Sequence, residues 1–390
     1  MAVRRFVPSD IPGVNRLHRD VWWPERSPEG WRWLEDNAAR REMDAPSGWV
    51  IEDVDGAPKA FLGNFIQRFW IGERILFGAT GFSVIVPPDQ RGGSRDLLSA
   101  FIAQPNCFAR YTLNANARSS PLYKKFGMAP WPIATHGLKL SWVINPVACL
   151  YGRALRRLVA REPRAARWLG EQLMPGRRRA LDMTGLPGGI SELTDLSDAS
   201  PYADFWTALR DQGRLTADRS PAMLRWRLSD PDLTVRPLHL ARRVNGEITG
   251  HALALLGKGN PIEPPMLEIL DLAALDRDRQ AIPALVGALL KLAPALGAAK
   301  VRLQVVSEST LRDLGDLARS ARREGGWGHC HAAFTPGLLG AGGQDVGGWR
   351  PTPFDGDYSF CIRPLPPRAP RGQWRRLSDK NVPTGSKASA

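Results

Sequence analysis

Two short segments of the chain carry groups that could do chemistry. In the first, a strand-like run ends at Pro87-Pro88, and the turn Gln90-Arg91-Gly92-Gly93-Ser94-Arg95 leads into a helix. Backbone N–H groups converge at the N-terminus of a helix, and glycine lets the backbone approach a bulky phosphate closely. The turn therefore predicts a pyrophosphate-binding site, although an ordinary strand–helix turn has the same pattern.

The second segment, Asn114 to Met128, follows the first after one helix and one strand. It contains Asn116 and, seven positions later, Tyr123. A phenol has an ordinary pKa of about 10 and is a proton donor at neutral pH. The alternative for Tyr123 is an aromatic side chain that only packs in a core.

Taken together, the segments resemble the two signature motifs of the GNAT superfamily of acyl-CoA N-acyltransferases. The family's pyrophosphate motif is Gln or Arg, two residues, Gly, one residue, then Gly or Ala; here it reads Gln90, Gly93, Arg95. The second motif reads Asn116, Tyr123 and Phe126-Gly127. The resemblance covers the first third of the chain, from Val3 to Ile144. It implies an acyltransferase that uses acetyl-CoA or another acyl-CoA as co-substrate.

Carried over to this chain, the resemblance implies a role for each motif residue. The turn binds the pyrophosphate through its amides, the preceding strand and an Asn follow the pantetheine arm, and Tyr123 is the catalytic acid. The implied coenzyme A-binding residues are Val84, Val86, Gln90, Arg91, Gly92, Gly93, Ser94, Arg95 and Asn116. On this basis Gly93→Glu is expected to abolish coenzyme A binding and to leave the fold intact.

The chain departs from the family pattern in two ways. Arg95 stands where a small residue usually ends the turn, so it adds a phosphate contact or crowds the site. The strand Phe82-Ser83-Val84 lacks the carboxylate that many members use as a general base. The remaining candidates for the base lie in or beside a Trp-rich segment near the N-terminus: His18, Glu25, Glu35 and Asp44.

Hydrophobic spacing and turn residues predict the elements that position these segments. The expected strands are Val3–Val7, Trp49–Val54, Ala60–Trp70, Ile75–Thr80, Phe82–Val86, Phe108–Leu113 and Leu138–Ile144. Helices are expected from Ser9 or Asp10, around Leu97 and Leu98, and over Ser119–Lys125. The last strand completes the unit, so residues 1–144 are the predicted N-terminal acyltransferase domain.

The order of elements repeats in the second half. The turn Asn245-Gly246 there corresponds to Asp55-Gly56 in the first half, and the later strand and helix keep nearly the same offset, which indicates an internal duplication. The second copy has no glycine in its turn, and Ser307 and Leu314 replace the motif Asn and Tyr. It is therefore predicted to be degenerate, and Glu268 and Asp271 are buried structural carboxylates or line an acceptor cleft. The fold class is α+β: two tandem GNAT-like domains, each a mixed, mostly antiparallel twisted sheet flanked by helices.

Three further regions complete the predicted organisation. Residues 145–187 are a basic linker with an amphipathic helix; window 145–182 has nine arginines and three acidic residues. Its apolar stripe (Val147, Leu150, Leu155, Leu158, Val159) packs across both domains, or the helix contacts an anionic membrane or nucleic acid. Residues 188–364 are the degenerate domain, and residues 365–390 are a disordered basic tail. In the degenerate domain Asp355-Gly356-Asp357 is predicted to form a turn before a strand, Tyr358 to Ile362.

Composition limits the partners only loosely. The net charge of +14 favours polyanions, but nucleic acid is an unlikely partner because basic linker and tail segments account for part of it. We expect a cytoplasmic protein with four free thiols and no metal site, since His329-Cys330-His331 lacks the spacing of a zinc site.

The prediction is direct transfer of an acyl group, most simply acetyl, from acyl-CoA to an amine or hydroxyl acceptor. The layout also resembles tandem proteins of bacterial surface-polysaccharide metabolism, which suggests a glycan or small-molecule acceptor. Two alternatives stay open: a Fem-like transferase that uses aminoacyl-tRNA, and a non-catalytic binding module with the same fold.

Overall fold

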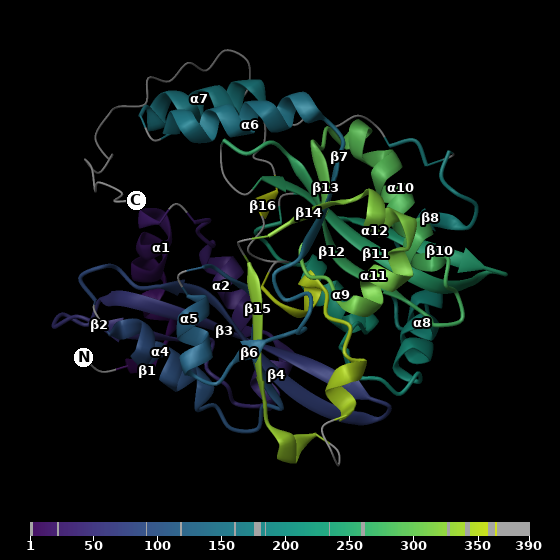
Figure 1. Ribbon diagram of the computed structural model, residues 1–390. Coiled ribbons are helices and arrows are strands. Elements are labelled where there is room, and N and C mark those ends of the chain that lie inside the picture. Colours follow the sequence, from purple (N-terminus) through teal and green to yellow (C-terminus); the bar gives the residue numbers. More distant parts are fainter. Residues whose placement is uncertain are drawn as a thin grey trace.

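The computed structural model describes most of the chain in two halves that lie side by side (Figure 1). The described residues are 3–21, 23–90, 92–117, 119–159, 161–174, 181–183, 185–233, 235–258, 262–325, 328–339, 344–357 and 363–364. The predicted tail of residues 365–390 and the predicted strand over residues 358–362 lie outside them.

Helices and strands of the first half follow the predicted order closely. They are β1 (Val3–Arg5), η1 (Pro8–Asp10), α1 (Ile11–Asp20), α2 (Pro28–Glu35), α3 (Ala38–Glu42), β2 (Gly48–Glu52), β3 (Pro58–Ile71), β4 (Arg74–Ile85), α4 (Gly93–Ile102), β5 (Ala109–Ala115), α5 (Ser120–Lys125), β6 (Ala129–Pro130) and β7 (Lys139–Val143). In α1 the side chains Val14, Leu17 and His18 are buried at three- and four-residue spacing, as an amphipathic helix on a sheet requires. The two strand runs expected at 75–80 and 82–86 form one continuous strand, β4.

The linker and the second half supply a matching set. They comprise α6 (Pro146–Val159), α7 (Pro163–Leu173), β8 (Ile190–Glu192), α8 (Pro201–Arg210), β9 (Thr216–Ala217), α9 (Pro221–Leu228), β10 (Leu238–Val244), β11 (Glu247–Lys258), β12 (Met266–Ala274), α10 (Ala281–Leu296), β13 (Lys300–Leu303), α11 (Glu308–Leu314), α12 (Asp316–Ser320), β14 (Arg322–Glu324), β15 (His329–Phe334), η2 (Pro336–Leu338), η3 (Gln344–Gly348), η4 (Pro353–Asp355) and β16 (Arg363–Pro364).

The two sheets have the same strand order. The first runs β1-β2-β3-β4-β5-β15-β6 with β9 at the side of β3, and the second runs β8-β10-β11-β12-β13-β7-β14 with β16 beside β11. Each is antiparallel except for one parallel pair, β4 with β5 and β12 with β13. The duplication and the predicted fold class are therefore confirmed.

One strand of each sheet comes from the other half of the chain. β7 pairs with β13 and β14 in the second sheet, and β15 pairs with β5 and β6 in the first. The expectation that Leu138–Ile144 completes the first unit is therefore wrong. β15 follows β7 at the offset that also separates the turns Asp55-Gly56 and Asn245-Gly246, so β7 and β15 are equivalent strands of the two copies. Each copy contributes this strand to the sheet of the other copy, and the two sheets interlock.

Large aromatic side chains join the two halves. Trp33 of α2 stacks on Trp226 of α9 with ring centroids 4.2 Å apart, and its indole N–H donates to the Trp226 carbonyl. Arg26 forms a buried ion pair with Asp230 across the same boundary. Cys107, Cys149 and Cys330 are free thiols, and Cys361 lies outside the described residues. Among the helices that the structure describes, none is long and apolar enough to cross a membrane.

The linker forms a helical hairpin, α6 and α7, on one side of the molecule (Figure 1). Its attachment is narrow: Leu155 is buried, and Gly152 lies so close to Pro264 that an added Cβ would be 2.9 Å from the Pro264 ring. The Lys258 ammonium donates to the last carbonyls of α7, at Gly170 and Met174. The predicted stripe is only partly buried, because Val147 and Leu150 are exposed.

Candidate active site

The parallel strands β4 and β5 are paired at one end only. Beyond the paired part they separate, and a cleft opens between them. Their ladder ends at the pair Thr80–Tyr111. On its other side β4 stays paired with β3, but the register shifts between Phe61 and Gly63, and Ser83 takes a left-handed φ of +50°. Such a bulge bends the strand, so the end of β4 turns away from β5.

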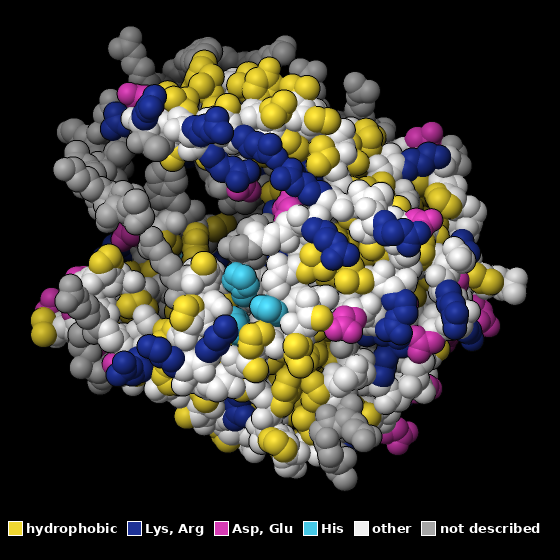
Figure 2. Space-filling model, in the orientation of Figure 1, with side chains coloured by type: hydrophobic (Ala, Val, Ile, Leu, Met, Phe, Trp, Pro, Cys, Tyr) yellow, Lys and Arg dark blue, Asp and Glu magenta, His cyan; other side chains and the backbone are white. Residues whose placement is uncertain are grey.

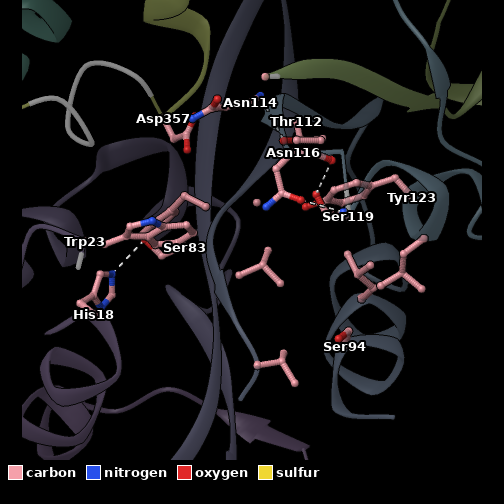
Figure 3. Close-up of a pocket in the computed structure, with 18 of the residues that line it drawn as sticks. His18, Trp23, Ser83, Ser94, Thr112, Asn114, Asn116, Ser119, Tyr123 and Asp357 are labelled. Carbon is pink, nitrogen blue, oxygen red and sulfur yellow. Dashed lines mark hydrogen bonds between the residues drawn. The ribbon is translucent and has the colours of Figure 1, made fainter. Parts of the chain in front are cut away.

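A cavity of about 490 Å³ occupies the space between the two strands (Figure 3). It is lined by His18, Trp23, Pro24, Arg26, Trp31, Gly81, Phe82, Ser83, Val84, Val86, Ser94, Leu98, Thr112, Asn114, Ala115, Asn116, Ser119, Leu122, Tyr123, Gly328 and Asp357. Of the residues predicted to bind coenzyme A, Val84, Val86, Ser94 and Asn116 line it. The structure thus brings the strand, the helix N-terminus and the second motif to one cavity.

The predicted pyrophosphate turn forms the N-terminus of α4. Gly92 is the N-cap with φ +91°, and the amides of Gln90, Gly93 and Arg95 donate to carbonyls of the turn itself. In the described part of the chain, the amides of Gly92 and Ser94 have no protein acceptor. An anion at this helix end would receive both N–H groups and the favourable helix dipole.

Four predicted residues of this turn, Gln90, Gly92, Gly93 and Arg95, do not line the cavity. The Arg95 side chain is exposed, so it does not crowd the cavity. The Gln90 side chain contacts Asp89 instead. Arg91 lies outside the described residues.

Gly93 is required for packing rather than for space around a phosphate. It is buried, and a Cβ added there would lie 2.8 Å from Ile51 Cδ1 and 3.5 Å from Val86 Cγ1. A Glu side chain at this position would point toward Ile51 and Val86, so loss of binding in Gly93→Glu would not separate phosphate repulsion from altered packing; that the fold stays intact remains a prediction. Ser94, half-buried and on the cavity wall, is the better position to test.

Tyr123 projects from α5 into the cavity wall, where its side chain is 3% exposed (Figure 3). Burial raises the pKa of Tyr123, and the negative charge of Asp357 raises it further, while a hydrogen bond with Thr112 acts in the opposite direction. The phenol therefore stays protonated at neutral pH. Its ring stacks on His331 of β15 with centroids 6.0 Å apart, so the exchanged strand fixes its orientation.

Asn116 shapes the start of α5. Its carbonyl oxygen accepts from the Ser120 amide at 2.9 Å, and its side-chain oxygen accepts from the Ser119 amide at 2.9 Å. Ser120 in turn is 2.7 Å from His331 Nε2. The Asn therefore holds the helix that carries Tyr123 at the cavity, and its exposed side chain is also within reach of a ligand there.

His18 and Ser83 form a pair on the opposite wall (Figure 3). His18 Nδ1 lies 2.9 Å from the Val14 carbonyl, which can only accept, so this nitrogen carries a proton. In the neutral ring, Nε2 then accepts a hydrogen bond from the Ser83 hydroxyl at 3.0 Å. The Val14 carbonyl thus orients His18, and His18 is hydrogen-bonded to the Ser83 hydroxyl. Such an arrangement can accept a proton from a reacting group.

The other predicted bases do not line the cavity. Glu25 is paired with Arg19, Glu35 contacts Arg40 and Ser47, and Asp44 is exposed. Only His18 of the four reaches the site.

The carboxylate that sequence reasoning missed is Asp357. It follows η4 in the second half, is 6% exposed, and lines the cavity near Asn114 and Tyr123 (Figure 3). The sequence Asp355-Gly356-Asp357 predicted only a turn. Nothing in the local pattern connects this turn to a cleft formed in the first third of the chain, because the connection depends on the interlocked sheets.

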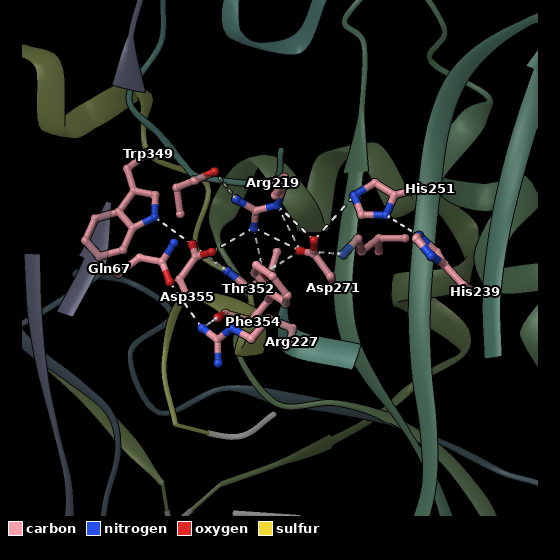
Figure 4. Close-up of polar contacts among 12 residues, drawn as sticks. Gln67, Arg219, Arg227, His239, His251, Asp271, Trp349, Thr352, Phe354 and Asp355 are labelled. Atoms are coloured by element: carbon pink, nitrogen blue, oxygen red, sulfur yellow. Dashed lines mark hydrogen bonds and ion pairs between the residues drawn. The ribbon is translucent and has the colours of Figure 1, made fainter. Parts of the chain in front are cut away.

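In the second copy, a cluster of buried charged and polar side chains packs against Asp271 of β12 (Figure 4). Arg219 lies at the centre, where its Nη2 donates to Asp271 at 2.9 Å and to Asp355 at 2.7 Å. Thr352 and Trp349 complete the hydrogen bonds of these two carboxylates. The neighbouring cavity is only about 50 Å³.

Both predicted carboxylates of the second copy are buried and paired. Burial acts to raise the pKa of Asp271, but the charge of Arg219 and the hydrogen bonds from Arg219 and Thr352 outweigh it, and the pKa is lowered. Glu268 pairs with Arg302 and Gln304. The structural interpretation of these two residues is therefore confirmed, and neither lines the 490 Å³ cavity.

Comparisons with known proteins find similarity in structure but not in sequence. No protein-family model matches the chain, and no curated protein matches it. A probable N-acyltransferase of unknown function from Enterococcus faecalis V583 superposes with a TM-score of 0.50 at 11% identity, over 85% of this chain and 72% of that one. Two GCN5-related N-acetyltransferases also match: one from Kribbella flavida (TM-score 0.48, 13% identity, 85% and 71% covered) and one from Anabaena variabilis ATCC 29413 (0.49, 12%, 85% and 72%). With its diverging parallel strands and its duplicated sheet, the chain has the fold of the GNAT superfamily, in two tandem copies.

Proposed function

We propose that this protein is an acyl-CoA-dependent N-acyltransferase that moves a short acyl group, such as acetyl, directly to an amine. The observation that supports it best is the cavity between β4 and β5. The N-terminus of α4 lies at one end, where Ser94 lines the wall, and Tyr123, His18 and Asp357 lie toward the other (Figure 3).

The donor would lie along the separated strands. The amides of Gly92 and Ser94 would receive the pyrophosphate, and the pantetheine arm would follow Val84 near the end of β4 and Val86 just after it. This placement brings the thioester to the level of Ser83, Thr112 and Tyr123, where the two strands begin to diverge.

The chemical step exchanges one bond for another. The amine nitrogen attacks the thioester carbonyl, the C–N bond forms, and the C–S bond breaks. Before the attack, the acceptor ammonium gives one proton to Ser83 as Ser83 gives its own proton to His18 Nε2, and after it the second nitrogen proton passes to the departing thiolate. The thiolate that leaves accepts a hydrogen bond from Tyr123. Since a phenol with a raised pKa is a weaker acid than a thiol, Tyr123 would act mainly by stabilising the developing charge.

Asp357 favours an amine over an acidic acceptor. A buried carboxylate in the cavity wall attracts an ammonium group, and it repels an anion. Amino sugars are the acceptors to test first, because the sequence layout resembles proteins of surface-polysaccharide metabolism.

The test is turnover with acetyl-CoA and a panel of amino sugars, polyamines and lysine peptides, followed by chromatography of released coenzyme A and mass spectrometry of the product. We expect release that depends on an amine acceptor, and Asp357→Asn should raise KM for that acceptor about tenfold or more, whereas Asp44→Asn, at an exposed carboxylate outside the cavity, should not. Absence of acceptor-dependent release across the panel, or products acylated only on hydroxyl groups, would contradict the proposal.

A further inference from the structure

The α6–α7 hairpin exposes an apolar surface to solvent. α6 has its buried side at Gly152 and Leu155. On a different side, Val147, Leu150 and Tyr151 recur at three- and four-residue spacing and are 58%, 61% and 49% exposed. Apolar side chains at this spacing on a helix normally pack in a core, but these three are exposed.

α7 continues this surface. Trp168 is 53% exposed and Leu173 is 51% exposed, although Trp is one of the side chains that a fold buries most readily. Figure 2 shows hydrophobic side chains along the outer side of the hairpin, with a row of Lys and Arg side chains beside them. The hairpin therefore presents an apolar strip bordered by cations.

The charge of the hairpin is strongly positive. Residues 145–174 contain six arginines and two glutamates, Glu162 and Glu171. All six arginines are exposed: Arg153, Arg156, Arg157, Arg161, Arg164 and Arg167. One of them, Arg167, is paired with Glu171 at 3.1 Å. Because the arginines outnumber the glutamates, the hairpin as a whole keeps a net positive charge.

We propose that this surface binds an anionic lipid bilayer, with α6 and α7 lying flat in the headgroup region. Trp and Tyr side chains favour that depth, aliphatic side chains enter the acyl boundary, and long arginine side chains extend to lipid phosphates. The proposal is independent of the acyltransfer reaction.

Two other occupants fit the hairpin less well. A second copy of the chain would bring twelve arginines together across a symmetric contact, and their repulsion opposes it. A nucleic acid would neutralise the arginines but would leave the aliphatic strip in water. Only an anionic surface with an apolar interior would both neutralise the arginines and remove the aliphatic side chains from water.

The experiment is flotation of the full-length protein with vesicles of phosphatidylcholine alone, or with about one third phosphatidylglycerol. We expect binding only to the anionic vesicles. The double variants Leu150→Ser/Trp168→Ser and Arg156→Glu/Arg157→Glu should each lower the partition coefficient by about tenfold or more. All four side chains are exposed, so the melting temperature should not change.

Matched control variants separate this surface from general effects of charge or hydrophobicity. Val54→Ser/Ile133→Ser removes two apolar side chains that are exposed elsewhere, and Arg277→Glu/Arg279→Glu reverses two exposed arginines of the second half. Both should float like the unmodified protein. The proposal is overturned if the protein does not bind anionic vesicles, if the controls lose binding equally, or if the apolar variant instead dissociates a dimer. Binding to a DNA duplex that needs the arginines but not Leu150 and Trp168, without flotation, would also overturn it.

Discussion

Asp355 and Asp357 are separated by a single glycine, yet they belong to two different sites. The Asp355 carboxylate accepts a 2.7 Å hydrogen bond from Arg219 in the buried cluster of the second copy, and Asp357 lines the open cavity of the first. The degenerate copy therefore holds the short segment that supplies a carboxylate to the other copy. In the proposed reaction, this relationship would give the second half a role at the acceptor end of the cavity.

Arg219→Leu should destabilise the protein strongly. The substitution leaves Asp271 and Asp355 buried without their cation, and breaking such a cluster costs about 3–5 kcal/mol. Urea unfolding followed by circular dichroism measures the loss. Arg225→Leu, which removes a half-exposed arginine paired with Asp198, should change the free energy of unfolding by about 0.5 kcal/mol or less. Equal stability of the two variants would show that the ion pairs of Arg219 with Asp271 and Asp355 do not stabilise the fold.

Stability should fall as the pH is lowered from about 6.5 toward 4. Burial lowers the pKa of His251 to about 4, so the native protein leaves this ring neutral in that range while the unfolded chain binds the proton. The free energy of unfolding then decreases by up to about 1.4 kcal/mol per pH unit for this side chain. Urea midpoints between about pH 4.5 and 7.5 test it, and His251→Asn should flatten the slope. A midpoint that is constant or rises on acidification would contradict the assignment.

Local signals predicted part of the cavity wall: Val84, Val86, Ser94 and Asn116 line it, and coenzyme A binding by them stays a prediction. The strand end, the glycine turn and the Asn-to-Tyr spacing all lie between Val84 and Met128, and each depends mostly on its immediate neighbours in sequence. The acceptor side could not be predicted as fully. His18 was one of four candidates, and nothing near it in sequence selects it over the three carboxylates. Ser83 lies within hydrogen-bond distance of His18 because of a bulge in β4, and this bulge forms only when β3 and β4 pair.

Tyr123→Phe should leave acyl-CoA affinity nearly unchanged and lower kcat by roughly 10²-fold. The ring stays in its contact with His331, so the lost hydroxyl is isolated as the cause. Steady-state kinetics with the best acceptor from the panel measure the effect. Tyr151→Phe, at an exposed tyrosine on α6, is the matched control and should be neutral. Full turnover of Tyr123→Phe would leave Tyr123 as a packing residue.

His18→Gln should lower kcat by roughly 10²–10³-fold with little change in acyl-CoA affinity, since the proposed base acts on the acceptor. Ser83→Ala should reduce kcat as well, because the proton passes through that hydroxyl. His136→Gln, at a histidine that does not line the cavity, is the control. Wild-type rates for both His18→Gln and Ser83→Ala at all pH values would exclude the pair from the reaction.

The two sheets were predictable as a duplication, but their interlocking was not. The spacing of apolar residues shows that Lys139–Val143 is a strand, and it does not show which sheet receives it. Its placement is fixed by the pairs with β13 and β14, which come much later in the chain. The same limit applies to β15, which no local pattern assigned to the first sheet.

Calorimetric titration with acetyl-CoA tests the central claim most directly, with Ser94→Glu and Ser99→Glu as matched variants. Both serines are on α4, but Ser94 lines the cavity at the helix N-terminus and Ser99 is exposed farther along. We predict one site per chain, about tenfold or more weaker binding for Ser94→Glu because a carboxylate there repels the pyrophosphate, and unchanged binding for Ser99→Glu. Two equivalent sites, no binding, or equal affinity of Ser94→Glu and the unmodified protein would contradict the account.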